Sequence, residues 1–184
     1  MICFITFLKK LIRFEFQTRN FKILYSLFYN ISNSLGKLYL LNTVTGRPAL
    51  AQPIKITNED SCISATSFNH IKYSMVGASC DDGSVAFWDV HTAKELQTFG
   101  EHKAPATGLA FSPVNEVLVA STGLDKRCVC YDTSLRKPVM GKSIEAPITS
   151  VDFAADGSNI VLGSSQVRFS LLAELASRLS SLIG

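Results

Sequence analysis

Short segments of this chain are apolar at consecutive positions, where a strand with one wet face would alternate with polar residues. Val85 and Phe87 fall on one face of a predicted strand. Ala86 and Trp88 fall on the opposite face, and residues 117–119 (VLV) are apolar without alternation. Because successive side chains of a strand point to opposite faces, both faces of these strands are predicted to be buried. The pattern therefore predicts β-sheets with another sheet packed on each side.

These segments belong to a repeat of about 43 residues. Residues 77–89 (GASCDDGSVAFWD) align with residues 120–132 (ASTGLDKRCVCYD), so that Trp88 and Tyr131 occupy equivalent positions in the two copies. A repeat of this length is typical of one blade of a β-propeller, a sheet of four antiparallel strands. The fold class is therefore expected to be all-β, and the function to be binding rather than catalysis.

The strands of the repeats are predicted in a constant order. First strands are expected at 63–68, 107–111 and 148–153, second strands at 74–79, 117–121 and 159–164, third strands at 37–42, 84–89 and 127–132, and fourth strands at 95–99 and 138–142. A ring of seven such blades would need roughly 280 to 300 residues, and the chain has 184. We expect a partial propeller, an arc of about three four-stranded blades over residues 34–165.

Residues 1–33 do not follow the repeat and contain half of the chain's 12 phenylalanines. The apolar run at residues 1–8 precedes Lys9 and Lys10, whereas a signal peptide places its charges first. The run is also far shorter than a membrane-spanning helix. Three interpretations remain open: a segment that is not native coding sequence, which the composition favours, a poorly packed native segment, and a basic amphipathic helix at a membrane surface.

Residues 166–184 also depart from the repeat, at the point where a third strand is due. Leucines recur there at helical spacing, at Leu171, Leu172, Leu175, Leu179 and Leu182. This spacing predicts an amphipathic helix over residues 166–184. Such a helix could cover the last blade, and a change of exon or reading frame would produce the same departure.

The charge and the cysteines exclude several classes of protein. The net charge is +3, and the basic excess lies in residues 1–33, so the repeats are close to neutral and a nucleic-acid-binding role is not expected. The five cysteines show no CxxC pair and no histidine at zinc-ligand spacing, which predicts reduced thiols and no metal site. They are Cys3, Cys62, Cys80, Cys128 and Cys130. Cys128 and Cys130, two apart on a strand, are predicted to be small core residues.

No motif indicates an enzyme or a cofactor site. Residues 141–143 (GKS) resemble the end of a phosphate-binding loop, but Arg136 stands where that loop requires a glycine. Ser112-Pro113 fits a proline-directed phosphorylation site and equally a turn after a first strand, and the turn is favoured. We therefore expect no catalytic residue, no cofactor and no small-molecule substrate.

Three phrases carry a resemblance to a known family. Residues 102–116 (HKAPATGLAFSPVNE), 123–133 (GLDKRCVCYDT) and 146–165 (APITSVDFAADGSNIVLGSS) resemble the WD-repeat family of centrosomal proteins named for neural-precursor expression and developmental down-regulation. The resemblance covers residues 34–165. In this family an N-terminal seven-bladed propeller localises the protein to centrosomes and spindle microtubules, and a C-terminal helical region binds the γ-tubulin ring complex.

The resemblance implies a non-enzymatic scaffold that targets the γ-tubulin ring complex to the centrosome and spindle pole. Its processes would be microtubule nucleation and mitotic spindle assembly, and its location the cytoplasm and cytoskeleton. Residues 166–184 are too short to stand for the γ-tubulin-binding region, so we expect this chain to be a fragment without it. The alternative is another WD-repeat adaptor, such as a ubiquitin-ligase substrate receptor.

In WD-repeat proteins four side chains of a blade form one hydrogen-bonded network, and the resemblance carries this network onto the present chain. In one blade the candidates are His102, Ser121 or Thr122, Asp125 and Tyr131, where tyrosine replaces the usual tryptophan. In the preceding blade they are Ser79, Asp82 and Trp88, and no histidine lies near Ser61. A structural role is favoured for the network, because a satisfied buried polar cluster fixes blade geometry without chemistry.

The loops at the rims of the blades are the expected places for partner contact. They are residues 81–83, 101–106 and 123–127. Lys103, Lys126 and Arg127 are the candidate contact residues, with a solvated loop charge as the alternative for each.

Overall fold

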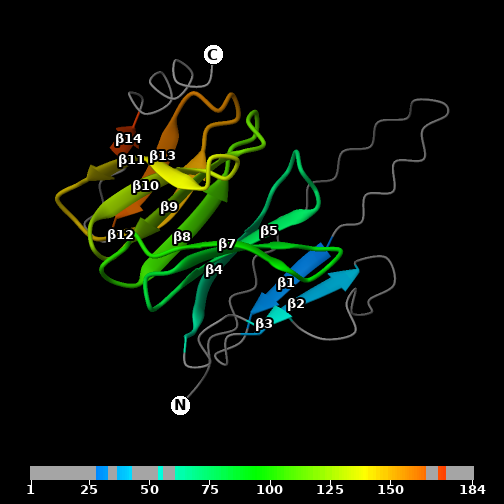
Figure 1. Cartoon of the computed structure of the whole chain (residues 1–184). Coiled ribbons are helices and arrows are strands. Elements are labelled where there is room, and N and C mark those ends of the chain that lie inside the picture. The colour runs from blue at the N-terminus through cyan, green and yellow to red at the C-terminus, as the bar shows by residue number, and fades with distance from the viewer. Residues whose placement is uncertain (1–27, 33–36, 43–53, 56–60, 165–169, 173–184) are drawn as a thin grey trace.

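The computed structural model describes residues 28–32, 37–42, 54–55, 61–164 and 170–172, and the architecture of these residues is all-β (Figure 1). Fourteen strands form four antiparallel sheets. The sheets contain β1–β3, β4–β7, β8–β11 and β12–β14, and each follows chain order from one edge to the other. Two sheets have four strands and the two flanking them have three, where the sequence predicted about three blades.

The strands have the following bounds. They are β1 (Phe28–Ser32), β2 (Lys37–Asn42), β3 (Ile54–Lys55), β4 (Ile63–Phe68), β5 (Met75–Cys80), β6 (Val85–Asp89), β7 (Glu95–Phe99), β8 (Ala106–Phe111), β9 (Leu118–Gly123), β10 (Arg127–Asp132), β11 (Lys137–Ser143), β12 (Ile148–Phe153), β13 (Ile160–Ser164) and β14 (Ser170–Leu172). Every strand expected from the repeat is present, and its ends differ from the prediction by two residues at most. The predicted fold class is confirmed.

The cores lie between the sheets, because single strands supply side chains to two of them. Val85 and Phe87 of β6 pack in the cluster shared with β8–β11, whereas Ala86 and Trp88 pack in the cluster shared with Leu38 of the β1–β3 sheet. These four side chains are at most 1% exposed. The predicted burial of both strand faces is therefore confirmed, and alternation assigns the two faces to different cores.

Strand β10 repeats this division one sheet further along the chain. Val129 and Tyr131 join Phe87 in the core between the two four-stranded sheets. Cys128 and Cys130 face the β12–β14 sheet and are fully buried, as the sequence predicted. The ring of Phe87 meets that of Phe111 edge-on at 5.8 Å, which fills the core in a favourable aromatic geometry.

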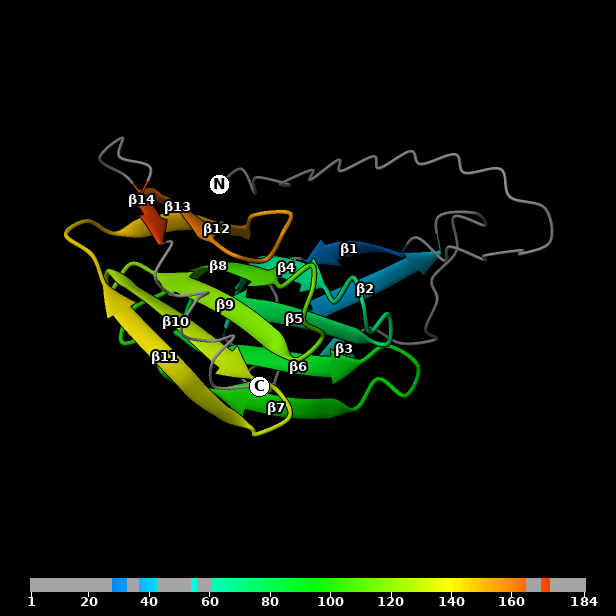
Figure 2. The same cartoon turned by 90° about the horizontal axis from the view of Figure 1, so that it is seen from above.

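The stacking of the sheets defines two ends of the molecule (Figure 2). First strands β4, β8 and β12 lie next to one another, and β1 contacts β4. The connections β5–β6, β7–β8, β9–β10 and β11–β12 meet at one end, called here the His102 end. The turns β4–β5, β6–β7, β8–β9, β10–β11 and β12–β13 meet at the other, called here the Val114 end.

Two sequence expectations differ from the structure at its margins. Strand β1 pairs with β2, so Phe28–Ser32 belongs to a sheet although residues 1–33 do not follow the repeat. Ser170–Leu172 pairs with β13 and is a strand, where leucine spacing predicted a helix. The free edge of β13 offers unpaired backbone groups, and satisfying them outweighs local helical periodicity. The rest of both segments, including Cys3, lies outside the described residues.

Candidate interaction surface

A chain of hydrogen bonds crosses the β8–β11 sheet from the His102 end to the interior. Nδ1 of His102 lies 3.0 Å from Oδ1 of Asp125, and Nε2 lies 2.7 Å from Oγ of Ser121. Ser121 in turn donates to the hydroxyl of Tyr131 at 3.2 Å. The structure thus brings together His102, Ser121, Asp125 and Tyr131. A tyrosine hydroxyl takes the place that an indole N–H would have.

The position of Ser121 resolves an alternative that the sequence left open. Odd-numbered residues of β9, such as Val119, face the same core as Tyr131, whereas Ala120 and Leu118 face the β12–β14 sheet. Ser121 therefore reaches Tyr131, and Thr122 points the other way. The Thr122 hydroxyl is buried and has no hydrogen-bond partner within the described part of the chain.

Asp125 anchors two loops at once. Its carboxylate accepts the amide of Lys103 at 3.0 Å and the amide of Arg127 at 3.2 Å, in addition to its contact with His102. Burial raises the pKa of Asp125, but the hydrogen bonds from His102 and the two amides outweigh it, and the pKa lies below its ordinary value. The ionised carboxylate ties the β7–β8 connection to the β9–β10 turn.

Gly123 leaves the space that this network needs. A Cβ at Gly123 would lie 2.8 Å from Nδ1 of His102 and 2.8 Å from Oδ1 of Asp125. A side chain there would separate the two groups, because real Cβ contacts are not this short. The glycine is thus part of the network although it makes no hydrogen bond in it.

The preceding sheet holds its loop in a different way. Asp82, equivalent to Asp125, accepts the hydroxyl of Ser61 at 2.7 Å, so a serine does here what His102 does in the next sheet. Ser79 donates to the carbonyl of Ala65 at 3.5 Å and lies on the opposite face of the sheet from Trp88. The structure does not bring Ser79 together with Trp88. Sequence reasoning missed Ser61, because only the fold places it beside a residue 21 positions later.

The three candidate contact residues all lie at the His102 end. Lys103 and Lys126 are exposed, and Arg127 is half-buried. One guanidinium N–H of Arg127 donates to the carbonyl of Glu101 at 3.0 Å, which holds this side chain against the β7–β8 connection. Lys103 and Lys126 therefore present their charges to solvent, whereas that of Arg127 is partly held in place.

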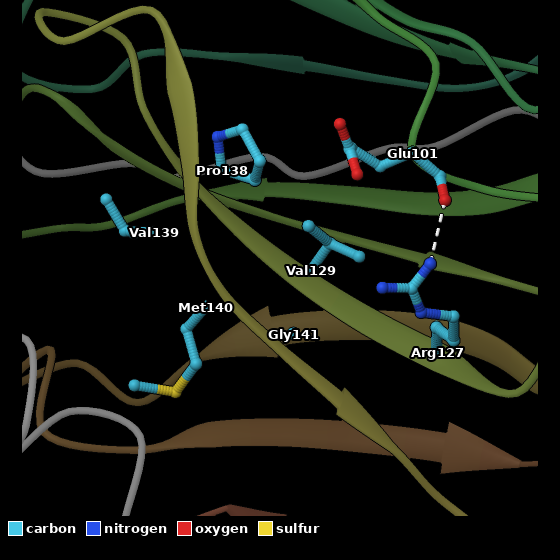
Figure 3. Close-up of a pocket in the computed structure, with 7 residues that line it drawn as sticks. All are labelled: Glu101, Arg127, Val129, Pro138, Val139, Met140 and Gly141. Carbon is cyan, nitrogen blue, oxygen red and sulfur yellow. Dashed lines mark hydrogen bonds between the residues drawn. The ribbon is translucent and has the colours of Figure 1, made fainter.

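A depression of about 270 Å³ lies beside Arg127, along β10 and β11 (Figure 3). Its lining residues are Glu101, Arg127, Val129, Pro138, Val139, Met140 and Gly141. The carboxylate of Glu101 is turned away from the guanidinium of Arg127 (Figure 3). The depression combines a carboxylate, a guanidinium and apolar side chains, a mixture suited to contact with a protein segment.

Three of the four described cysteines lie in the cores between the sheets. Cys80, Cys128 and Cys130 are buried, whereas Cys62 is half-buried. No group of three or more His, Cys, Asp or Glu side chains suited to a metal occurs among the described residues. Burial raises the pKa of Cys80 to about 11. A hydrogen bond with Cys128 and burial raise the pKa of Cys130. The thiols of Cys80 and Cys130 are therefore protonated at neutral pH. In the described ranges, no helix is long and apolar enough to cross a membrane.

Comparison with known proteins agrees with this architecture. Residues 93–132, from the turn before β7 to the end of β10, match the family model "WD domain, G-beta repeat". One chain of the crystal structure of the Mitotic Checkpoint Complex superposes with a TM-score of 0.67 at 15% identity, over 78% of this chain and 43% of that one. At this identity the likeness concerns the fold alone. The described sheets form part of a WD-repeat β-propeller.

Sequence similarity is higher to a smaller set of proteins. The chain is 45% identical over 106 residues to Protein NEDD1 of Bos taurus and 47% identical over 103 residues to that of Mus musculus. These matches cover 54% and 53% of this chain and 16% of each relative. A guanine nucleotide-binding protein subunit beta of Arabidopsis thaliana is 29% identical over 97 residues, 48% of this chain and 26% of that protein. The predicted resemblance to this group of WD-repeat proteins is confirmed.

Proposed function

We propose that this chain is a protein-interaction scaffold that helps to target the γ-tubulin ring complex to the centrosome and spindle pole. Its processes are microtubule nucleation and mitotic spindle assembly, and its location is the cytoplasm and cytoskeleton. One observation carries the proposal: the 44–47% identity to Protein NEDD1 of three mammals, within a chain that folds as WD-repeat sheets. The chain spans 16% of the length of these relatives, so the propeller is assigned the localising part of the function.

The loops at the His102 end are the proposed contact surface. Lys103 follows His102 directly, and its amide is bonded to Asp125, so the network fixes the backbone from which the exposed ammonium group projects. Lys126 occupies the turn next to it. Rigid loops of this kind lose little entropy when a partner binds. The proposal assigns binding to these residues and no catalytic step.

Localisation in dividing cells tests the proposal. The full chain, fused to a fluorescent protein, is expected to concentrate at centrosomes and spindle poles during mitosis. Lys103→Glu is expected to weaken this enrichment severalfold, because it reverses a charge on the proposed surface. Lys94→Glu is the matched control, since Lys94 is an exposed lysine in the β6–β7 turn at the opposite end.

Two results would count against the proposal. A fusion protein that is diffuse in mitotic cells, with or without Lys103→Glu, would contradict the proposed centrosomal targeting. Copurification with a ubiquitin ligase, without enrichment at the poles, would favour the adaptor alternative.

A further inference from the structure

Large apolar side chains are exposed in three turns at the Val114 end. The exposed fraction is 67% for Tyr73, 61% for Val114, 58% for Leu135 and 38% for Ile71. Tight turns normally place polar residues, glycine or proline at such tips. Ile71 and Val114 stand at equivalent positions, 43 residues apart. Large apolar tips therefore occur in both complete sheets.

The backbone that carries these side chains is held in place by buried caps. The amide of Ile71 donates to Oδ1 of Asn69 at 2.9 Å, and the amide of Leu135 donates to Oδ1 of Asp132 at 2.9 Å. The amide of Val114 makes the corresponding, longer bond to Oγ of Ser112 at 3.4 Å. The capping residues are at most 3% exposed. The exposed side chains thus project from ordered turns, which lowers the entropy lost on binding.

Hydrogen bonds between the turns join them into one surface. Nδ2 of Asn69 donates to the carbonyl of Glu116 at 2.6 Å, which links the first turn to the second. The amide of Thr133 donates to the carbonyl of Val117 at 2.9 Å, which links the second turn to the third. We call residues 69–74, 112–117 and 132–137 together the Val114 platform.

The outward charges of the Val114 platform are mainly positive. Lys72, Arg136 and Lys137 are exposed, against Glu116 as the exposed acid. The carboxylate of Asp132 faces inward, because the residue is 3% exposed and its Oδ1 accepts the amides of Ser134 and Leu135 and the hydroxyl of Ser134. Burial raises the pKa of Asp132, but these bonds outweigh it and the pKa lies below its ordinary value. Within the platform, exposed cations therefore outnumber the exposed acid, which favours an acidic partner.

We propose that the Val114 platform docks an acidic segment of a partner protein that also carries large apolar side chains. The apolar side chains at the turn tips bury apolar surface against the partner, and Tyr73 is the most exposed aromatic residue among them. The cations favour a partner with negative charge. The platform is small, so the contact is a transient one. It lies at the opposite end from Lys103 and Lys126 and does not depend on the centrosomal function proposed above.

Selection from a random displayed peptide library on the full chain tests this proposal. The enriched peptides are expected to combine Asp or Glu with Leu, Phe or Trp. A synthetic copy of the strongest binder is then measured by fluorescence anisotropy. Val114→Ser with Leu135→Ser is expected to weaken its binding about tenfold. Leu124→Ser is the control, because Leu124 is 43% exposed at the His102 end.

A second variant separates the charge from the apolar contacts. Lys72→Glu with Lys137→Glu leaves the four apolar tips and the caps in place. It is expected to weaken the acidic peptide severalfold and to remove most of the salt dependence of its binding. Circular dichroism and a cooperative urea transition establish that each variant is folded.

Three outcomes would overturn the proposal. The enriched peptides could be neutral or basic. They could bind the Val114→Ser, Leu135→Ser variant as tightly as the unmodified chain. Phosphatidylserine vesicles could bind through the same residues while no peptide does, which would assign the platform to a membrane surface instead.

Discussion

At the scale of single residues, short polar side chains decide where the loops lie. Asp125 holds Lys103 and Arg127 by their amides, and its contact with His102 continues to Ser121 and the interior. Ser61 does comparable work for Asp82 with one hydroxyl. Such groups are costly to leave unpaired when buried, so each loop follows the position of its acid.

The lowered pKa of Asp125 predicts a loss of stability in acid. An aspartate whose folded-state pKa is lowered stabilises the fold above its unfolded pKa, and this contribution disappears as the pH falls through the folded pKa. Urea midpoints measured from neutral to acidic pH should fall more steeply for the unmodified chain than for Asp125→Asn. Glu145→Gln, at an exposed carboxylate, is the control. Parallel curves for Asp125→Asn and the unmodified chain would contradict the prediction.

The sequence predicts some of these residues and not others. His102, Asp125 and Tyr131 follow from the resemblance to WD-repeat proteins, whose blades carry such a network at these positions. Ser121 could be separated from Thr122 only when the strand faces were known. Ser61 carries no signal in its neighbours, because its partner Asp82 comes close only in the folded chain.

At the scale of elements, equivalent turns of the two complete sheets adopt similar backbones with different residues. Gly83 in the β5–β6 turn has φ of 87°, and Lys126 in the β9–β10 turn has φ of 66°. Both lie in the left-handed region, which suits glycine and strains a residue with a Cβ. A Cβ at Gly83 would also lie 2.6 Å from the carbonyl oxygen of His102. At Gly83 both the positive φ and the close His102 carbonyl favour glycine, whereas at Lys126 only the positive φ does.

The comparison predicts opposite effects for two substitutions. Lys126→Gly should stabilise the chain by about 1 kcal/mol, because it relieves the left-handed strain at a cost in unfolded-state entropy. Gly83→Ala should destabilise it by about 2 kcal/mol or more, from strain and overlap with the His102 carbonyl. Urea denaturation at neutral pH measures both. If Gly83→Ala costs no more free energy than Lys126→Gly gains, movement of the β7–β8 connection relieves the overlap at Gly83.

Strands that belong to the repeat are predicted well from the sequence. A strand that forms only because it pairs with the free edge of another strand is predicted poorly. β6 and β10 follow from the repeat and its apolar pattern, because both faces of each strand are packed by neighbouring sheets. β14 is a strand because β13 offers it a backbone partner, although the leucines of residues 166–184 have helical spacing. Local pattern cannot report such a partner, since the pairing depends on a strand elsewhere in the chain.

At the scale of the whole molecule, four sheets are held together by three apolar clusters and by hydrogen bonds that cross between sheets. Asn69 makes one such bond, to the carbonyl of Glu116, and its Oδ1 also caps its own turn. Gln97 makes another, from its side-chain amide to the carbonyl of Thr133. These bonds couple the two complete sheets at the Val114 end.

The coupling predicts a distinct effect of two substitutions at Asn69. Asn69→Asp keeps an acceptor for the turn but loses the bond to Glu116, and should cost about 1 to 3 kcal/mol. Asn69→Ala loses the cap as well and should cost more. Asn115→Ala is the control, because Asn115 caps the amide of Val117 within its own turn.

Unfolding monitored by two signals provides the measurement. Fluorescence of Trp88, the single tryptophan, reports the β4–β7 sheet, and circular dichroism reports all sheets. The two transitions should separate in Asn69→Asp and coincide in Asn115→Ala. Coincident transitions in both variants would show that the apolar cores alone couple the sheets.

The division of β6 between two cores limits which changes of length the chain can accept. Inserting one residue before Phe87 would move it to the face of Trp88 and Trp88 to the face of Phe87, so both cores would receive the wrong side chains together. An insertion of one whole repeat would leave every strand in register and add a sheet between two existing ones. Growth and shrinkage of this molecule are therefore expected to proceed by entire blades, whereas single insertions are confined to the turns.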